Sequence, residues 1–287
     1  MKKSWLISLL YHDYFDYPLT KSELDKWQVH PRLHLKSYLP AQAGKLSATS
    51  YKNNYFYLKS HEKLVSLRKK RETISEEKLK IAQRAAKLLK LIPTIKMVGI
   101  TGSLAMNNCS ENSDIDFMIV TSRGTLWSTR LFTLLFLKIM RLPVRSRGDK
   151  NEKDKLCMNI WMDESDLIIH EQNLYTAHEL AQVVPLISRG ETYEKLLLTN
   201  KWILNFWPNA VKITKNFSSK KLRITSYALL VTRPIEKLAF FLQRLHMAGY
   251  ISNETITSTR AFFHPINWSK KLETHLKKSN INIPCSP

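Results

Sequence analysis

Apolar positions near the start of the chain recur at helical spacing. The first such face consists of Leu6, Leu9 and Leu10. A second helix is predicted to begin after Thr20, because Thr20 and Glu23 have the three-residue spacing of a capping box. A third, short helix is expected over residues 31–38.

Two short stretches with strand character follow, at residues 46–51 and 55–58. Asn53-Asn54 separates them and is typical of a tight turn, so the pattern predicts a hairpin. Three helices and a hairpin within about sixty residues predict a winged-helix-like domain over residues 1–60. The aromatic residues of this hairpin could stack on bases, but alternation of this kind favours packing.

Residues 61–92 are rich in charge and carry an intermittent apolar face at helical spacing. Pro93 ends the pattern, because proline cannot continue a helix without losing a backbone hydrogen bond. We expect one connector helix, or two, leading into the next segment.

The segment 93–172 alternates strand and helix patterns. Strands are predicted over residues 96–101, 115–121 and 156–162, with a short helix from Ser103. An amphipathic helix is predicted over residues 127–141, between the second and third strands. Its expected buried side consists of Leu131, Leu134, Leu135 and Ile139. A turn and a returning hairpin strand are expected at residues 163–170.

The remaining residues, 173–287, have mainly helical patterns. Helices are expected over residues 174–185, 193–206, 234–249 and 268–278. The predicted fold class is therefore α+β. It comprises an N-terminal winged helix, a central mixed sheet with flanking helices over residues 93–172, and a C-terminal helical region.

Composition and charge narrow the classes of partner. With 44% hydrophobic residues the chain is globular, and its formal net charge of +21 favours polyanions. Nucleic acid is the commonest such partner, although nucleoside triphosphates and anionic membranes also fit the sign of the charge. A solvated basic surface is the alternative. Three cysteines without metal-ligand spacing indicate free thiols in a reducing compartment. No apolar run is long enough to span a bilayer, so we expect a cytoplasmic protein with no membrane partner.

The most informative motif is Thr101-Gly102-Ser103, followed after ten intervening residues by Asp114-Ile115-Asp116. A glycine at the end of a strand allows backbone amides to approach a phosphate closely, and Ser103 adds a hydroxyl at a helix start. Alternate strand positions project from one face, so both carboxylates are expected to point the same way. That arrangement suits divalent cations in phosphoryl transfer.

This pattern resembles the signature of the DNA polymerase β-like nucleotidyltransferase superfamily. The resemblance implies that Gly102 and Ser103 bind nucleotide phosphates and that Asp114 and Asp116 hold Mg²⁺ or Mn²⁺. The whole arrangement is also similar to bacterial nucleotidyltransferase-domain proteins that carry an N-terminal winged helix, which would extend the likeness over most of the chain.

One departure from that pattern concerns the third carboxylate, which many members supply from a later strand as a general base. The strand at residues 156–162 contains no acid. Asn159 is the best positional candidate; its amide can ligate a metal or orient a hydroxyl, but it cannot accept a proton. Asp163, just past the predicted end of the strand, is a possible substitute.

Other polar residues give weaker signals. Arg123 and Lys155 are candidates for binding the triphosphate, although basic residues this common usually lie on the surface. His178-Glu179 lacks the second histidine of a zinc-binding helix, which favours a packing or capping role.

The sequence predicts an enzyme that transfers a nucleoside monophosphate from an NTP to an acceptor hydroxyl. RNA is the favoured acceptor because of the charge, with a protein or a small molecule as alternatives. The competing hypothesis is a nucleic-acid-binding or regulatory protein whose transferase core has lost activity. The winged helix and the missing third acid motivate it.

Overall fold

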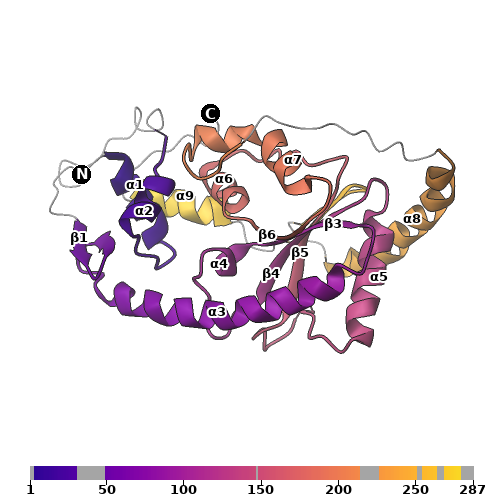
Figure 1. Ribbon diagram of the computed structural model, residues 1–287, viewed down its shortest axis with the longest axis horizontal. Helices are drawn as coiled ribbons and strands as arrows, with labels where there is room; N and C mark the ends of the chain where they lie inside the picture. The colour runs from indigo at the N-terminus through magenta and orange to yellow at the C-terminus, as the bar shows by residue number, and fades with distance from the viewer. Residues whose placement is uncertain are drawn as a thin grey trace.

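A computed structural model describes residues 3–30, 49–146, 148–213, 226–250, 254–263 and 268–278. It is an α+β structure in which a mixed six-stranded sheet lies between layers of helices (Figure 1). The predicted fold class is confirmed at this level.

The N-terminal elements are two helices and a hairpin. They are α1 (Lys3–Asp13), α2 (Lys21–Lys26), β1 (Thr49–Lys52) and β2 (Tyr55–Leu58). The predicted capping box is present at Thr20 and Glu23, and Asn53 and Asn54 both take positive φ in the turn. The expected helix at residues 31–38 lies outside the described residues, so the winged helix stays a prediction.

The helix α3 (Lys63–Leu89) runs from the N-terminal elements to the sheet as one continuous element of 27 residues. Two buried cations fix its course. Arg68 pairs with Glu23 of α2 at 2.9 Å, and Lys78 pairs with Asp154 at 2.6 Å. Both cations are almost fully buried, and their side chains join three regions that are distant in sequence.

The six-stranded sheet has the order β6-β3-β4-β5-β8-β7. Its strands are β3 (Ile95–Ile100), β4 (Ile115–Thr121), β5 (Leu156–Asp163), β6 (Val184–Ser188), β7 (Thr255–Ile256) and β8 (Arg260–Phe262). Strands β4 and β5 are parallel, and all other neighbours are antiparallel. The crossover between the parallel strands contains a helix, as such connections usually do.

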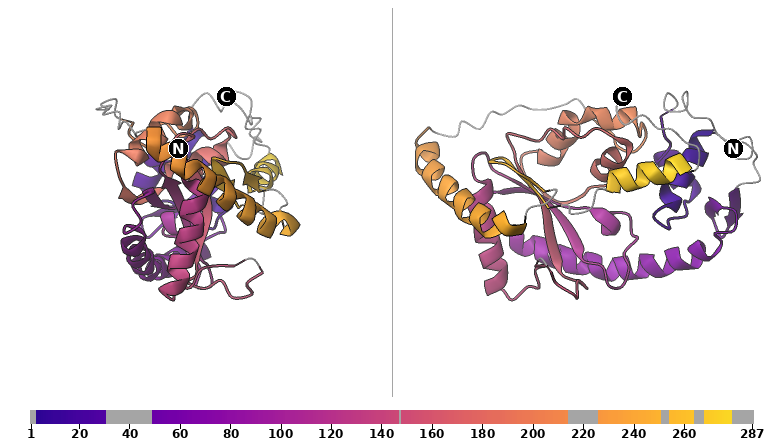
Figure 2. Two further views of the ribbon diagram at one scale, coloured as in Figure 1. Left: turned by 90° about the vertical axis from the view of Figure 1, so that its right-hand side faces the viewer. Right: turned by 180° about the vertical axis from the view of Figure 1, so that it is seen from behind.

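The remaining helical elements are α4 (Gly102–Ala105), α5 (Leu126–Ile139), α6 (Leu174–Ala181), α7 (Thr192–Thr199), η3 (Lys201–Asn205), α8 (Ser226–Met247), η4 (Ala248–Tyr250) and α9 (Trp268–Lys278). Helix α9 returns to the N-terminal part of the molecule, where it contacts α1 and α6 (Figure 2).

Two buried apolar clusters lie on opposite faces of the sheet. Helices α3, α5 and α8 contribute to one cluster, and we call that side of the sheet the α3 face. Helices α1, α2, α6, α7 and α9 contribute to the other, on the α6 face. Within β4, Phe117 and Ile119 point to the α3 face, whereas Met118 and Val120 point to the α6 face, as strand alternation requires.

The N-terminal helices share their core with the α6 face of the sheet. Ile7 of α1 and Leu24 of α2 belong to the same buried cluster as Met97, Met118 and Met162 of the sheet. Residues 3–30 therefore do not build a separate core of their own.

Four sequence predictions about individual elements are wrong. Residues 184–188 form a strand paired with β3, not the end of a helix. Residues 167–170 form no returning strand, and the predicted helical region 173–287 contributes three strands to the sheet. On α5, the expected buried residues Leu131, Leu135 and Ile139 are exposed, whereas Trp127, Thr133 and Leu137 are buried.

Candidate functional site

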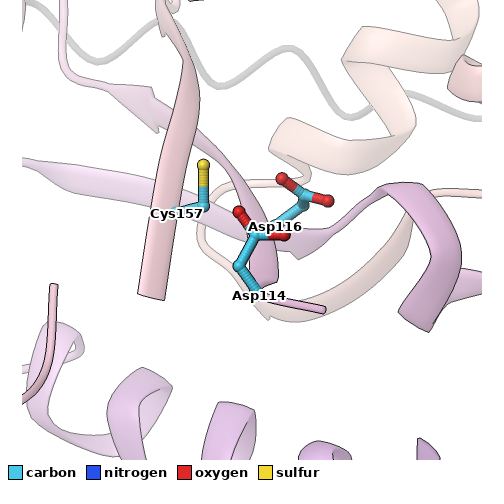
Figure 3. A group of neighbouring side chains, drawn as sticks. All are labelled: Asp114, Asp116 and Cys157. Carbon is cyan, nitrogen blue, oxygen red and sulfur yellow. The ribbon is translucent and has the colours of Figure 1, made fainter. Parts of the chain in front are cut away.

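The structure brings Asp114 and Asp116 together at one end of the sheet. Asp116 is the second residue of β4, and Asp114 lies directly before that strand. Carboxylate oxygens of both residues and the sulfur of Cys157 lie within 4.8 Å of one another (Figure 3). Because Asp116 alternates with Phe117, its side chain lies on the α6 face of the sheet.

Gly102 packs directly against this pair. Its φ is +60°, and a Cβ atom built on it would lie 2.5 Å from Oδ2 of Asp116. The N–H of Thr101 donates a hydrogen bond of 3.1 Å to the backbone carbonyl of Asp116. Glycine is therefore required here for two reasons, a left-handed backbone and the close approach of a carboxylate.

Ser103 follows in α4, a helix of only four residues. The expected contribution of a helix dipole is therefore small, and the backbone amides of the turn are the stronger feature for binding an anion. The hydroxyl of Ser103 lies 3.4 Å from the sulfur of Cys109.

Helix α3 holds the loop that leads from α4 to Asp114. The ammonium of Lys78 donates hydrogen bonds to the backbone carbonyls of Glu111 and Ser113, at 3.1 and 2.8 Å. The hydroxyl of Ser75 accepts a hydrogen bond of 3.0 Å from the N–H of Cys109. These buried contacts fix the approach to the carboxylates, and nothing in the sequence pattern pointed to them.

Strand β5 presents an amide and a thiol at the place where the superfamily pattern would have a third carboxylate. Asn159 donates a 2.7 Å hydrogen bond from Nδ2 to Oδ1 of Asp116. Cys157 aligns with Asp116 in the parallel register, and the register shifts between Cys157 and Ile160. This irregularity allows Cys157 and Asn159 to face the carboxylates while Ile160 and Met162 pack on the same side in the core.

The electrostatics of the Asp114 and Asp116 carboxylates favour the binding of a cation between them. Burial, and next the charge of Asp114, raise the pKa of Asp116 to about 7. Asp114 is partly compensated by Arg145, whose Nη1 lies 2.7 Å from Oδ2 of Asp114 and whose Nη2 pairs with Glu152. Arg145 comes from the loop before β5, and sequence analysis did not single it out.

The donor atoms fit a hard divalent ion. Two carboxylates supply oxygens, and Oδ1 of Asn159 is buried without a hydrogen-bond partner. Burial raises the pKa of the Cys157 thiol well above its usual range, so without a metal ion the sulfur is protonated. The carboxylate and amide oxygens are ligands of the kind that Mg²⁺ and Mn²⁺ prefer, and the sulfur of Cys157 lies beside them.

Helix α6 adds a further carboxyl, Glu179, on the same face. Burial and then the charge of Asp116 raise the pKa of Glu179 to about 8, and Gln182 donates a 2.7 Å hydrogen bond to its Oε1. The prediction of a packing role was correct for its neighbour His178, which is buried with Nε2 3.2 Å from that of His12. The same prediction did not anticipate that the charge of Asp116 would raise the pKa of Glu179.

Two other candidates, Arg123 and Asp163, lie away from the site. Thr121 and Asp163 pair at the opposite end of β4 and β5 from Asp116, about 16 Å along the strand. Arg123 follows that end, so neither Arg123 nor Asp163 reaches the carboxylates. Lys155 lies beside the site, because its carbonyl accepts from the N–H of Ile115, but its ammonium is paired with Asp149 at 2.8 Å.

Two comparisons with known proteins identify no relative of this chain. No protein-family profile matches the chain, and no curated protein is significantly similar to it. Within the residues that the structure describes, no helix has the length and apolar character needed to cross a membrane.

Proposed function

We propose that this chain is a metal-dependent nucleotidyltransferase. In the reaction an acceptor hydroxyl attacks the α-phosphorus of an NTP, its oxygen becomes bonded to the nucleoside monophosphate, and pyrophosphate leaves. The observation that supports this proposal is the contact of the Gly102 turn with Asp116, beside Asp114. This chemistry needs at least a turn that binds phosphate and two carboxylates that bind metal, close to one another.

The residues around the turn have distinct roles in this proposal. The amides after Gly102 and the hydroxyl of Ser103 bind the phosphates. Asp114 and Asp116 hold Mg²⁺ or Mn²⁺, which when bound would neutralise the triphosphate and lower the pKa of the attacking hydroxyl. Asn159 keeps Asp116 in position through its amide hydrogen bond.

Proton removal from the acceptor requires a base that β5 does not supply. Asn159 cannot accept a proton, and the Cys157 thiol is held protonated. We assign this role to Glu179, because α6 packs on the face of the sheet that carries Asp116 and the charge of Asp116 raises the pKa of Glu179. A pKa of about 8 suits a base that works near neutral pH.

RNA is the acceptor that we propose first, because a chain with a net charge of +21 attracts polyanions. The N-terminal elements, as a winged helix, would help to bind that acceptor. A protein or a small molecule with a hydroxyl remains an alternative acceptor.

The direct test uses radioactive NTPs, Mg²⁺ or Mn²⁺, and total cellular RNA. The wild type should label RNA, and Asp114→Asn and Asp116→Asn should each lose the labelling by at least about a thousandfold. Asp25→Asn, an exposed acid of α2, is the control that should retain full activity. Undiminished labelling by both site variants would refute the mechanism.

A nucleic-acid-binding protein with an inactive core is the second candidate. It is favoured by β5, where a thiol and an amide replace an acid, and by Arg145, which already neutralises part of the charge on Asp114. RNA binding that weakens steeply with salt, with no turnover of any NTP on any acceptor tested, would support it.

A further inference from the structure

Exposed apolar side chains are concentrated on two helices at one end of the molecule. Fifteen large apolar residues are exposed among those described, and ten of them belong to α5 with its C-cap or to α8. Their exposed fractions lie between 44% and 68%. We call this set the α5–α8 surface: Leu131, Phe132, Leu135, Ile139, Met140, Ile235, Leu238, Phe241, Leu242 and Leu245.

One side of α8 packs against α5 and forms hydrogen bonds with it. Glu236 of α8 accepts hydrogen bonds from the N–H groups of Trp127 and Ser128 at the start of α5. Ala239 and Gln243 are buried along the same side, and Gln243 donates to the carbonyl of Trp127 at 2.8 Å. Helix α8 is therefore fixed in place, and its exposed side chains are held in a defined array.

The other side of α8 carries a regular apolar seam. Its members are Ile235, Leu238, Leu242 and Leu245. They are separated by three, four and three residues, which is the heptad spacing of helices that pair with another helix. A helix that is apolar on two sides is usually buried on both, and among the described residues only the α5 side of α8 is covered.

Helix α5 continues this surface. The periodicity of its sequence predicts that Leu131, Leu135 and Ile139 are buried, yet the described structure leaves them exposed. In the left view of Figure 2, α8 crosses α5 at the outer end of the molecule, and part of α5 extends beyond the crossing. Both helices therefore carry exposed apolar residues of the α5–α8 surface at this end of the molecule.

The area of the α5–α8 surface matches the area that one partner contributes to a stable protein interface. Ten large side chains, each with about half of roughly 200 Å² exposed, present on the order of 1,000 Å² of apolar surface. The largest apolar patch on a typical monomer is about 300–600 Å². One partner in a standard interface buries about 800 Å².

We propose that the α5–α8 surface is the interface of a homodimer, in which the α8 seam of one copy packs against that of its partner around a two-fold axis. An apolar seam is self-complementary, as an isologous contact requires. The charged side chains of α8 next to the seam, Lys237 and Arg244, are both basic and exposed. Their mutual repulsion is screened by salt, so the dimer should become tighter as ionic strength rises.

The test is sedimentation equilibrium on nuclease-treated protein at 0.1 and 0.5 M salt, over a range of concentrations. The wild type should be a dimer whose dissociation constant falls at the higher salt. The double variant Leu238→Glu/Leu242→Glu should be a monomer with an unchanged circular dichroism spectrum. Tyr51→Glu changes an exposed aromatic residue in the N-terminal hairpin, at the opposite end of the molecule, and should remain dimeric.

Three results would overturn the proposal. A wild type that is monomeric at all concentrations removes the dimer, and binding of that monomer to anionic vesicles would assign the surface to a membrane instead. A double variant that still dimerises places the interface elsewhere. Association that disappears at 0.5 M salt would indicate bridging by residual nucleic acid.

Discussion

The two faces of the central sheet differ in the chemistry that they bury. On the α3 face, β4 contributes Ile115, Phe117 and Ile119, and the cluster around them is apolar. On the α6 face the same strand begins with Asp116 before Met118 and Val120. A single strand therefore supplies an apolar support on one side and a charged group on the other, because its side chains alternate.

The α6 face also buries groups that titrate. His12 of α1 and His178 of α6 meet there with Trp27 and Trp207 around them, and Glu179 lies beside His178 in sequence. Burying such groups costs stability unless they stay neutral or find partners. Both faces bury large apolar clusters and so stabilise the fold, but only the α6 face buries carboxyl and imidazole groups next to the candidate site.

After the two carboxylate variants, the largest effect should come from Gly102→Ala. A methyl group there would collide with Asp116 and would also require φ of +60°, so we expect transfer activity to fall by about a hundredfold or more. Gly190→Ala is the matched control, because Gly190 has φ of +59° with nothing within 4 Å of the added Cβ. Equal activity loss in both variants would mean that the contact with Asp116 is unimportant.

Acid should destabilise the α6 face through its buried histidines. Burial lowers the pKa of His12 to about 4 from an ordinary value near 6.5, so the unfolded chain binds a proton that the folded chain does not. The contribution of His12 to stability should be full above about pH 6.5 and should fall by roughly 3 kcal/mol as pH drops from there to about 4.

Urea unfolding at several pH values measures this effect. The variant His12→Gln should lose that part of the pH dependence, although it is less stable at pH 7.5. The raised pKa values of Asp116 and Glu179 change stability in the opposite direction, and the difference between the wild type and His12→Gln cancels their contribution. The same difference at pH 6.5 and at pH 4.5 would contradict the burial of a neutral His12.

A smaller effect is expected when a third acid is restored by Asn159→Asp. The change replaces an amide donor with a negative charge beside Asp116, and should lower stability without metal by about 2 kcal/mol. Mn²⁺ should then raise the melting temperature of the variant more than that of the wild type, because it binds only the folded site. An equal increase in both proteins would exclude position 159 from the metal site.

The smallest expected change concerns the pH profile of Glu179→Gln. Since the pKa of Glu179 is raised to about 8, ionisation of this carboxyl should increase the wild-type rate as pH rises through that value. The variant should lack this increase and be about tenfold slower at pH 9, with little difference at pH 6. An unaltered profile would remove Glu179 as the base.

Strong local patterns made part of the structure predictable. Periodicity or spacing over a few residues predicts the strands β3, β4 and β5 and the capping box at Thr20. It also predicts that the side chains of Asp114 and Asp116 lie close together. Asn159, the positional candidate for the missing third acid, does contact Asp116.

Other features depend on contacts between distant segments. Strands β7 and β8 have two and three residues and exist through their pairing with each other and with β5. In β6, Pro185 suggested the end of a helix, yet proline is tolerated in a strand at the edge of a sheet. Helix α5 has apolar residues on several sides, so its pattern alone could not identify the buried face. Arg145 and Glu179 carry no local signal of their proximity to Asp114 and Asp116.

The central claim, that Asp114 and Asp116 hold a divalent ion next to the Gly102 turn, is tested most directly by crystals grown with Mn²⁺ and a non-hydrolysable NTP. Anomalous scattering should show manganese between the two carboxylates, with triphosphate oxygens against the amides after Gly102. Manganese bound elsewhere, with nucleotide absent from the turn, would contradict the account.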